Sequence, residues 1–143
     1  MSLGEPAKGL DERMIRAVVD QFYARAREDD LIGPVFKTAV PDDKWAAHLD
    51  TITDFWSSML LHTGRYHGRP LAKHFLLPPL SDAHFQRWLA LFRKTALEVC
   101  PPDIAAIFIE RSERVGNSFR LNMAMARGEN TIHMRPLRRE EIG

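Results

Sequence analysis

Apolar residues recur at intervals of three and four along most of this 143-residue chain. The first such stretch follows Asp11, a good helix N-cap, and ends at about Arg27. Its apolar residues are Met14, Ile15, Val18, Val19, Phe22 and Ala26. This spacing places them on one face of an α-helix. No segment alternates with a period of two over enough residues to predict a strand, so the chain is expected to be all-α.

Three further apolar stripes follow, separated by glycine- and proline-containing breaks. We expect Asp42 or Asp43 to cap the second helix. Ser81 and Asp103 are the expected caps of the third and fourth. The stripes consist of Trp45, Leu49, Ile52, Trp56, Met59 and Leu60; of Phe85, Trp88, Leu89, Phe92, Ala96 and Leu97; and of Ile104, Ile107, Phe108, Val115 and Phe119. The pattern predicts four substantial helices. Leu31, Ile32, Val35 and Phe36 are expected to form a compact apolar corner between the first two.

The composition is that of a single globular domain, with 45% hydrophobic and 27% charged residues. A net charge of +1 gives no basic face for nucleic acid. The one cysteine, Cys100, excludes an internal disulfide and fits a reducing compartment. No apolar run approaches the ~18–20 residues of a membrane span, and the N-terminus lacks the apolar core of a signal peptide. These features predict a cytoplasmic protein without nucleic-acid or membrane partners.

We expect the folded domain to span residues 11–127, with Gly128 ending the last helix. Residues 1–10 are expected to be a flexible lead-in. Residues 128–143 show no periodicity and are expected to form a solvated tail. Arg135–Arg139 is unlike a nucleic-acid site because Glu140 and Glu141 balance its charge.

One histidine, His74, lies among apolar residues in a segment that cannot carry a long helix. Pro78 and Pro79 follow it, and proline removes an amide donor and clashes with the preceding turn. Histidine is the commonest metal-ligating side chain, and apolar neighbours would keep water from a bound cofactor. Taken alone, however, a single histidine among leucines is more often a core residue.

Most common catalytic and cofactor motifs are absent from the sequence, including metalloprotease, Walker, dinucleotide and thioether-attachment signatures. What remains is Tyr23, His48, His74 and Trp88, on four different segments and among many aromatic residues. These aromatic rings either fill an ordinary helical core or enclose a planar apolar cofactor. Periodicity alone leaves both readings open.

Several short pieces of the chain, between Asp11 and Arg127, occur in a distinctive order. They are Phe22-Tyr23; Gly33-Pro34-Val35-Phe36; Trp45 and His48; Phe55-Trp56-Ser57-Ser58-Met59-Leu60; Tyr66-His67-Gly68-Arg69-Pro70-Leu71; Lys73-His74; Leu77-Pro78-Pro79; and Arg87-Trp88-Leu89-Ala90-Leu91-Phe92. This order resembles the truncated haemoglobins, in particular the third group of that family. The double-glycine loops of the first two groups are missing, as is usual in the third. The resemblance implies a truncated globin fold, a 2-on-2 helical sandwich around haem.

The resemblance also implies roles for single residues on the two sides of the haem. His74 matches the proximal histidine that bonds the iron. Tyr23 and Trp88 match two polar aromatic residues on the distal side. His48 matches the distal histidine, which could donate to the ligand, gate the site or bond the iron itself.

Other residues are expected at the haem periphery. Phe36 matches the phenylalanine that packs on the porphyrin, and Phe55 and Phe92 are expected to bind the cofactor as well. Lys73, Arg65 and Tyr66 are candidates for the propionates. The cofactor implied is haem b, held without a covalent bond.

The function implied is binding of dioxygen and other diatomic ligands, NO and CO, at five-coordinate ferrous iron. Dioxygen bound to ferrous iron is partly superoxide-like, so donors such as Tyr23 and Trp88 would hold it tightly. A hydrogen bond to a charged acceptor contributes about 1.5–3 kcal/mol. Redox use of the site, on nitric oxide or peroxide, would need a reductase for which the chain has no domain. The protein is expected to be a monomer or weak dimer. The alternative reading is a haem-free all-α interaction module, which would be colourless.

Overall fold

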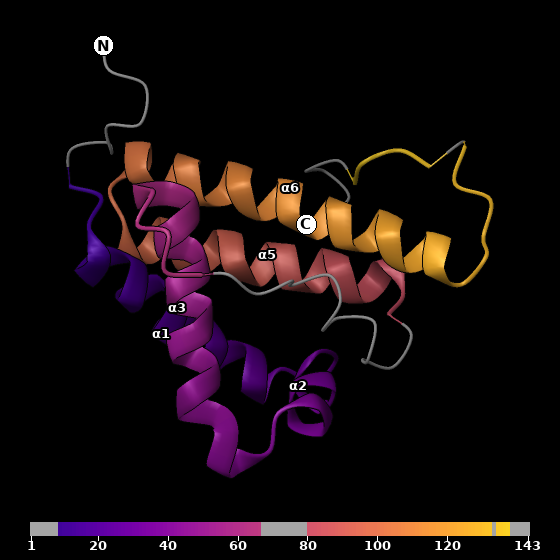
Figure 1. The fold of residues 1–143 in the computed structure, drawn as a ribbon, viewed down its shortest axis with the longest axis horizontal. Helices are drawn as coiled ribbons and strands as arrows, with labels where there is room; N and C mark the ends of the chain where they lie inside the picture. The colour runs from indigo at the N-terminus through magenta and orange to yellow at the C-terminus, as the bar shows by residue number, and fades with distance from the viewer. Residues whose placement is uncertain (1–8, 67–79, 133, 138–143) are drawn as a thin grey trace.

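The computed structural model describes residues 9–66, 80–132 and 134–137, and its regular elements there are helical (Figure 1). The elements are α1 (Glu12–Glu28), α2 (Gly33–Ala39), the 3-10 turn η1 (Asp42–Lys44), α3 (Trp45–Leu61), α5 (Asp82–Val99) and α6 (Pro102–Ala126). No strand occurs in these three ranges. The all-α prediction is confirmed.

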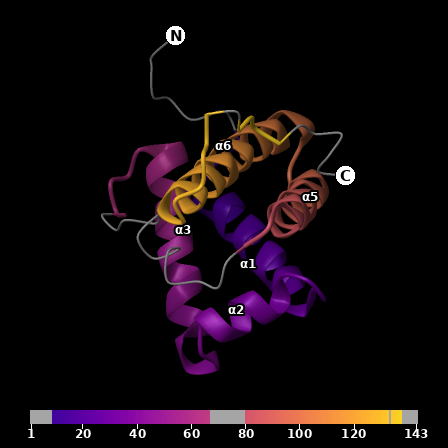
Figure 2. The same cartoon turned by 90° about the vertical axis from the view of Figure 1, so that its right-hand side faces the viewer.

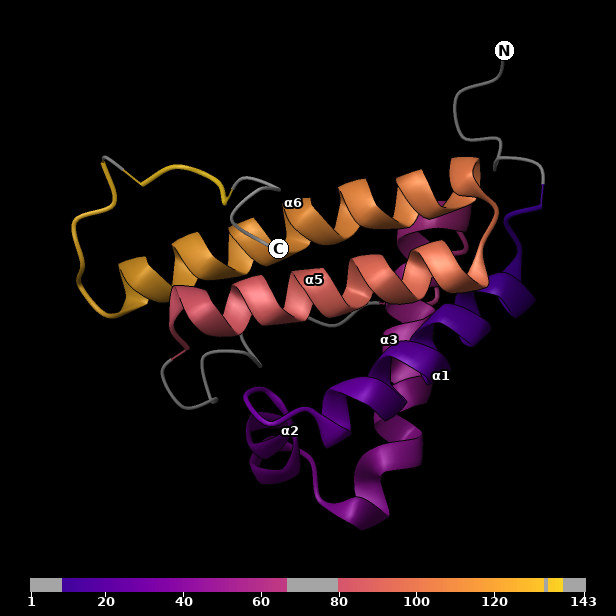
Figure 3. The same cartoon turned by 180° about the vertical axis from the view of Figure 1, so that it is seen from behind.

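The four long helices form two pairs, α5 with α6 and α1 with α3. α5 and α6 run antiparallel side by side, joined at Cys100–Pro101, while α3 crosses their direction steeply (Figures 1 and 3). α1 packs against both α3 and α5, so it joins the two pairs. The short α2 packs on α1 and lies at the opposite end of the molecule from α6 (Figure 2). This arrangement is the predicted 2-on-2 sandwich. No helix in the described ranges has the length and apolar character needed to cross a membrane.

Two of the predicted helix starts are confirmed, and two need correction. The Asp11 carboxylate accepts a hydrogen bond from the Met14 amide at 2.8 Å, and Ser81 precedes α5 as predicted. Asp42 and Asp43 begin η1, so α3 itself starts later, at Trp45. Asp103 is not the cap of α6.

Proline explains the earlier start of α6. The helix begins at Pro102, whose fixed φ suits a first helical position where an amide donor would have no partner. Asp103 therefore lies in the first turn, where its negative charge still complements the helix dipole.

The predicted apolar corner after α1 contains the start of the short helix α2, which includes Val35 and Phe36, whereas Leu31 and Ile32 precede it. Pro34 stands in its first turn and favours helix initiation there. A Cβ added at Gly33 would lie 2.6 Å from the Arg27 carbonyl oxygen. Glycine therefore allows the chain to turn closely over the end of α1, which places Phe36 beside that helix.

Two clusters of buried residues form the core. The larger joins α1, α3, α5 and α6, and its fully buried members include Phe22, Phe92 and Phe108. The smaller lies between α5 and α6 and contains Phe85, Leu89, Phe119, Met123 and Leu137.

Leu137 corrects the prediction of a wholly solvated tail. Its side chain is 8% exposed, and its amide donates to the Asn117 side chain at 2.9 Å. One leucine in a polar segment gives no periodic signal, so its return to the α5–α6 groove was not predictable.

A nearly buried carboxylate, Asp29, fixes the junction between α1, α2 and α5. Its Oδ2 accepts hydrogen bonds from the Leu31 and Ile32 amides at 2.9 and 3.0 Å. Its Oδ1 accepts from Arg87 of α5 at 2.8 Å, and the Asp29 side chain is only 11% exposed. Burial raises the pKa of this carboxyl, but the amide donors and Arg87 outweigh burial and leave the pKa below its usual value.

We expect Asp29→Ala to lower the free energy of unfolding by about 1–3 kcal/mol, because buried donors lose a charged acceptor. Asp30→Ala, at the exposed neighbouring position, is the matched control and should change it by about 0.5 kcal/mol or less. Since the pKa of Asp29 is lower in the folded than in the unfolded state, its contribution is present above the unfolded value and is lost as pH falls through the folded value. Urea unfolding at neutral and strongly acidic pH measures both effects. Equal stabilities of the two variants would contradict this role.

Candidate functional site

Tyr23 of α1 and three rings from α2 and α3 form a cluster of four aromatic side chains. Tyr23 contacts Phe36 of α2 at a centroid distance of 5.5 Å. It contacts Trp45 and His48 of α3 at 6.1 and 5.7 Å. All three contacts are close to perpendicular, the edge-to-face geometry that ring quadrupoles favour. We call these four residues the Tyr23 cluster.

The phenol at the centre of the cluster is shielded from water. Tyr23 is 7% exposed, and burial raises the pKa of its hydroxyl well above the ordinary value. Desolvation disfavours the phenolate, so the hydroxyl stays protonated at neutral pH. It can therefore donate a hydrogen bond to a ligand.

His48 lies between two rings of the cluster. Trp45 is three residues earlier on the same face of α3, and the two rings are 5.5 Å apart with an interplanar angle of 31°. Tyr23 meets the imidazole at 88°. The Nε2 atom of His48 is buried. The structure thus brings Tyr23 and His48, both predicted for the distal side, into contact.

Arg27 covers the outer edge of the cluster, a feature that the sequence analysis missed. Its guanidinium lies over the Trp45 ring, 4.5 Å from the centroid, and forms an ion pair with Asp42. Arg27 follows Tyr23 by four residues, one helical turn, so the two share a face of α1. The four-residue spacing could have indicated that Arg27 lies near Tyr23. It could not indicate that Arg27 contacts Trp45 of α3.

Trp88 of α5 lies one ring away from Tyr23. Its indole contacts Phe22 at 6.4 Å, and Phe22 contacts Tyr23 at 4.8 Å. Trp88 is half-buried and packs against both core clusters. The third predicted distal residue therefore borders the site through Phe22.

The other predicted cofactor contacts occupy two different environments. Phe92 is 2% exposed and stacks on Trp56 at 5.2 Å within the larger core cluster. Phe55 contacts Trp56 and, at 5.4 Å, Tyr66. The proposed cofactor roles of Phe55, Tyr66 and Phe92 stay predictions.

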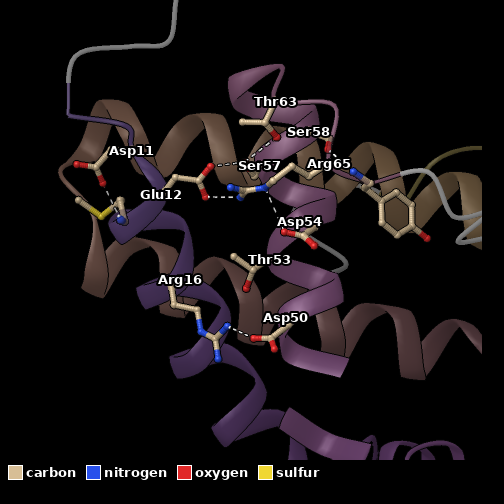
Figure 4. A network of polar contacts seen from close by, with 12 residues as sticks. Asp11, Glu12, Arg16, Asp50, Thr53, Asp54, Ser57, Ser58, Thr63 and Arg65 are labelled. Atoms are coloured by element: carbon tan, nitrogen blue, oxygen red, sulfur yellow. Dashed lines mark hydrogen bonds and ion pairs between the residues drawn. The ribbon is translucent and has the colours of Figure 1, made fainter. Parts of the chain in front are cut away.

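Arg65, a predicted propionate partner, belongs to a polar network between α1 and α3 (Figure 4). Its guanidinium contacts the carboxylates of Glu12 at 2.6 Å and Asp54 at 3.2 Å. The buried Ser57 hydroxyl donates to Glu12 at 2.5 Å and meets Thr63 at 3.0 Å. The Ser57 hydrogen bond is the largest contribution that lowers the pKa of Glu12. The propionate role of Arg65 stays a prediction.

This network fixes the loop that follows α3. His62 ends the helix with a left-handed backbone, φ 59°, and the Tyr66 amide donates to the Ser58 hydroxyl at 2.8 Å. The chain is thereby held against α1 and α3 up to Tyr66. The predicted iron ligand, His74, and Lys73 lie outside the described residues.

The described residues fit the distal half of a haem site. The Tyr23 cluster supplies aromatic walls, one buried neutral phenol and one buried imidazole nitrogen. Three different helices contribute these groups, so the site depends on the packing of α1 against α2 and α3.

Comparison with known proteins agrees with this geometry. The bacterial-like globin family matches residues 7–117. The group 3 truncated hemoglobin ctb of Campylobacter jejuni is 32% identical over 112 residues, which cover 77% of this chain and 88% of that protein. The crystal structure of a group III truncated hemoglobin from Campylobacter jejuni matches with a TM-score of 0.75 at 31% identity. That match covers 83% of this chain and 94% of the other.

The matched residues include all four aromatic and imidazole positions that the sequence analysis placed around the iron. They span the helices α1, α2, α3 and α5, the whole sequence between α3 and α5, and α6 up to residue 117. The chain therefore belongs to the bacterial-like globin family, and it is a haem-binding globin with the truncated globin fold.

Proposed function

We propose that this globin holds haem b without a covalent bond, through His74, and binds dioxygen, NO and CO at five-coordinate ferrous iron. The observation that carries the proposal is the Tyr23 cluster, in which a buried protonated phenol meets a buried imidazole. When bound, haem supplies the iron position at which diatomic ligands are held. The chain's own residues determine which ligand stays there.

Tyr23 and Trp88 are the proposed hydrogen-bond donors to the ligand. A neutral phenol and an indole N–H both donate strongly to an acceptor that carries negative charge. Dioxygen on ferrous iron carries more negative charge than carbon monoxide, so the donors favour dioxygen. Slow release of oxygen follows, which suits retention or chemistry better than transport.

The rest of the cluster keeps water away from the Tyr23 donor. Phe36 and Trp45 meet the Tyr23 ring edge-on from two helices, and Arg27 covers Trp45 from outside. In a site without water, each hydrogen bond to the ligand is stronger than at the surface. His48 contacts the Tyr23 ring and is the proposed third distal residue.

The haem periphery is proposed to contact Phe36 on its face, with Phe55 and Phe92 as further apolar contacts. Lys73, Arg65 and Tyr66 are the proposed propionate partners. The Phe55–Tyr66 contact supports this, because it holds the segment after α3 against that helix, and Lys73 and His74 follow in the sequence.

A redox use of the same site is the second candidate. Nitric oxide would be oxidised to nitrate by dioxygen, or peroxide would be reduced, with electrons from a separate reductase. We rank this redox use second, because the proposed donors Tyr23 and Trp88 favour retention of dioxygen. We further propose a cytoplasmic protein that is a monomer or weak dimer.

The purified protein should show a Soret band that shifts after dithionite and again after carbon monoxide, and His74→Ala should lose it. Without the imidazole the iron has no protein ligand, so haem should be retained only when free imidazole is added. His62→Asn is the matched control, since asparagine tolerates the left-handed backbone there. Unchanged haem retention in His74→Ala would refute the axial assignment. A colourless protein that takes up no hemin would refute the function.

Replacing both donors, Tyr23→Phe with Trp88→Phe, should raise the oxygen dissociation rate by about a hundredfold or more, since each lost hydrogen bond contributes about 1.5–3 kcal/mol. The carbon monoxide dissociation rate should change little. Stopped-flow displacement measures both rates, with His62→Asn at an exposed position as the control. Equal acceleration for both gases would mean that the shape of the site, and not hydrogen bonding, controls release.

The Tyr23 hydroxyl should resist ionisation as long as the protein is folded. The chain has two tyrosines, so a Tyr66→Phe variant isolates Tyr23. Burial raises the folded pKa of Tyr23 above the unfolded value of 10.0, so its contribution to stability is present below pH 10 and is lost as pH rises further. Tyrosinate absorbance and circular dichroism, followed together against pH, should change at the same pH. Ionisation near pH 10 with intact helices would contradict the buried phenol.

A further inference from the structure

Gly116 lies in the interior of the 25-residue helix α6, directly against Trp88 of α5. A Cβ built at Gly116 would lie 2.7 Å from Trp88 Cζ3 and 3.3 Å from Trp88 Cε3. It would also lie 3.1 Å from Leu89 Cδ2. Such separations are shorter than normal carbon–carbon contacts, which begin near 3.5 Å. The six-membered ring of Trp88 therefore occupies the space that any other residue at 116 would need.

Conformational freedom does not explain glycine at this position. Gly116 has ordinary helical geometry within α6, where alanine would favour the helix more than glycine does. The chain thus carries a helix-weakening residue in the middle of its longest described helix. What the glycine provides is room for the indole.

We propose that Gly116 is a positioning residue, which seats the Cε3–Cζ3 edge of Trp88 against α6 and so directs the indole N–H towards the ligand. This edge and Nε1 lie on opposite sides of the rigid bicyclic ring. When the Cε3–Cζ3 edge is held against α6, Nε1 faces away from that helix. The inference rests on the proposed function, because Trp88 is a ligand donor only there.

The surroundings of Trp88 make its position sensitive to a methyl group at 116. Phe22 limits the indole on α1 at 6.4 Å, and Phe22 is itself fully buried against Tyr23 and Phe92. The indole is rigid and turns about only two side-chain bonds, so a clash at its edge moves the whole ring. Leu89 can adjust by a rotamer change. The donor atom of Trp88 cannot stay in place when its far edge is displaced.

The test is a double-mutant cycle on the haem-loaded full-length protein, with Gly116→Ala, Trp88→Phe and the two combined. Trp88→Phe should raise the oxygen dissociation rate by about tenfold, as expected for one lost charge-assisted hydrogen bond. Gly116→Ala should raise it several-fold while the carbon monoxide dissociation rate stays within about twofold. Phenylalanine lacks the second ring, so Gly116→Ala should add nothing in the Trp88→Phe background.

Met123→Ala is the matched control, because Met123 is buried in the same α5–α6 interface two turns further along α6. It should lower the melting temperature without changing oxygen dissociation. A Gly116→Ala variant with wild-type oxygen release, with equal acceleration of both gases, or with its full effect retained in the Trp88→Phe background would overturn the positioning role.

If Gly116→Ala fails to fold, folding of the combined Gly116→Ala, Trp88→Phe variant shows the cause. If Trp88→Phe restores folding, the clash with the indole is established, and restored folding supports the inference. If the combined variant also fails to fold, Gly116 serves helix packing alone and the inference falls. Failure of the wild-type protein to hold haem refutes the proposed function itself, whereas a haem-loaded protein without a Gly116 effect refutes only this inference.

Discussion

The packing of α1 between α3 and α5 is the interaction on which the rest of this structure depends. Two adjacent residues of α1 contact different helices, because successive side chains on a helix point about 100° apart. Phe22 is fully buried and contacts Trp88 and Phe92 of α5. Tyr23 faces α2 and α3 and contacts Phe36, Trp45 and His48 there. A shift of α1 would therefore disturb the core and the site together.

Polar contacts hold the ends of this helix where the aromatic rings alone would not. At its N-terminal end, Glu12 binds Ser57 and Arg65, and at its C-terminal end Asp29 binds Arg87 and two amides of the turn into α2. Both carboxylates have a lowered pKa, so both are charged at neutral pH. The phenol between them has a raised pKa and is neutral. One helix thus carries charged groups at its ends, where donors and cations outweigh burial, and a neutral phenol between them, where burial raises the pKa.

Periodicity predicted the helices well because each helix is a local property of the chain. The start of α1 at Asp11 and the end of α6 before Gly128 were readable from caps and spacing. The order of the short pieces between Asp11 and Arg127 indicated the family, and the family implied a shared location for Tyr23, His48 and Trp88. Contacts between distant segments were not readable, such as Arg65 with Glu12, Leu137 with the α5–α6 groove, or Gly116 with Trp88. These depend on how the helices pack, which no local pattern encodes.

The ion pair that covers Trp45 differs from the rings beneath it in how quickly it can rearrange. Asp42 is 90% exposed, so its pairing with Arg27 is weakened by water and contributes little to stability. Exposed side chains change rotamer in picoseconds to nanoseconds, whereas packed helices move in microseconds or longer. The Asp42 side chain can therefore leave and rejoin Arg27 while α1 and α3 stay in place. The polar cover of Trp45 thus rearranges quickly at its outer end, whereas the ring contacts beneath it change only as fast as the helices that carry them.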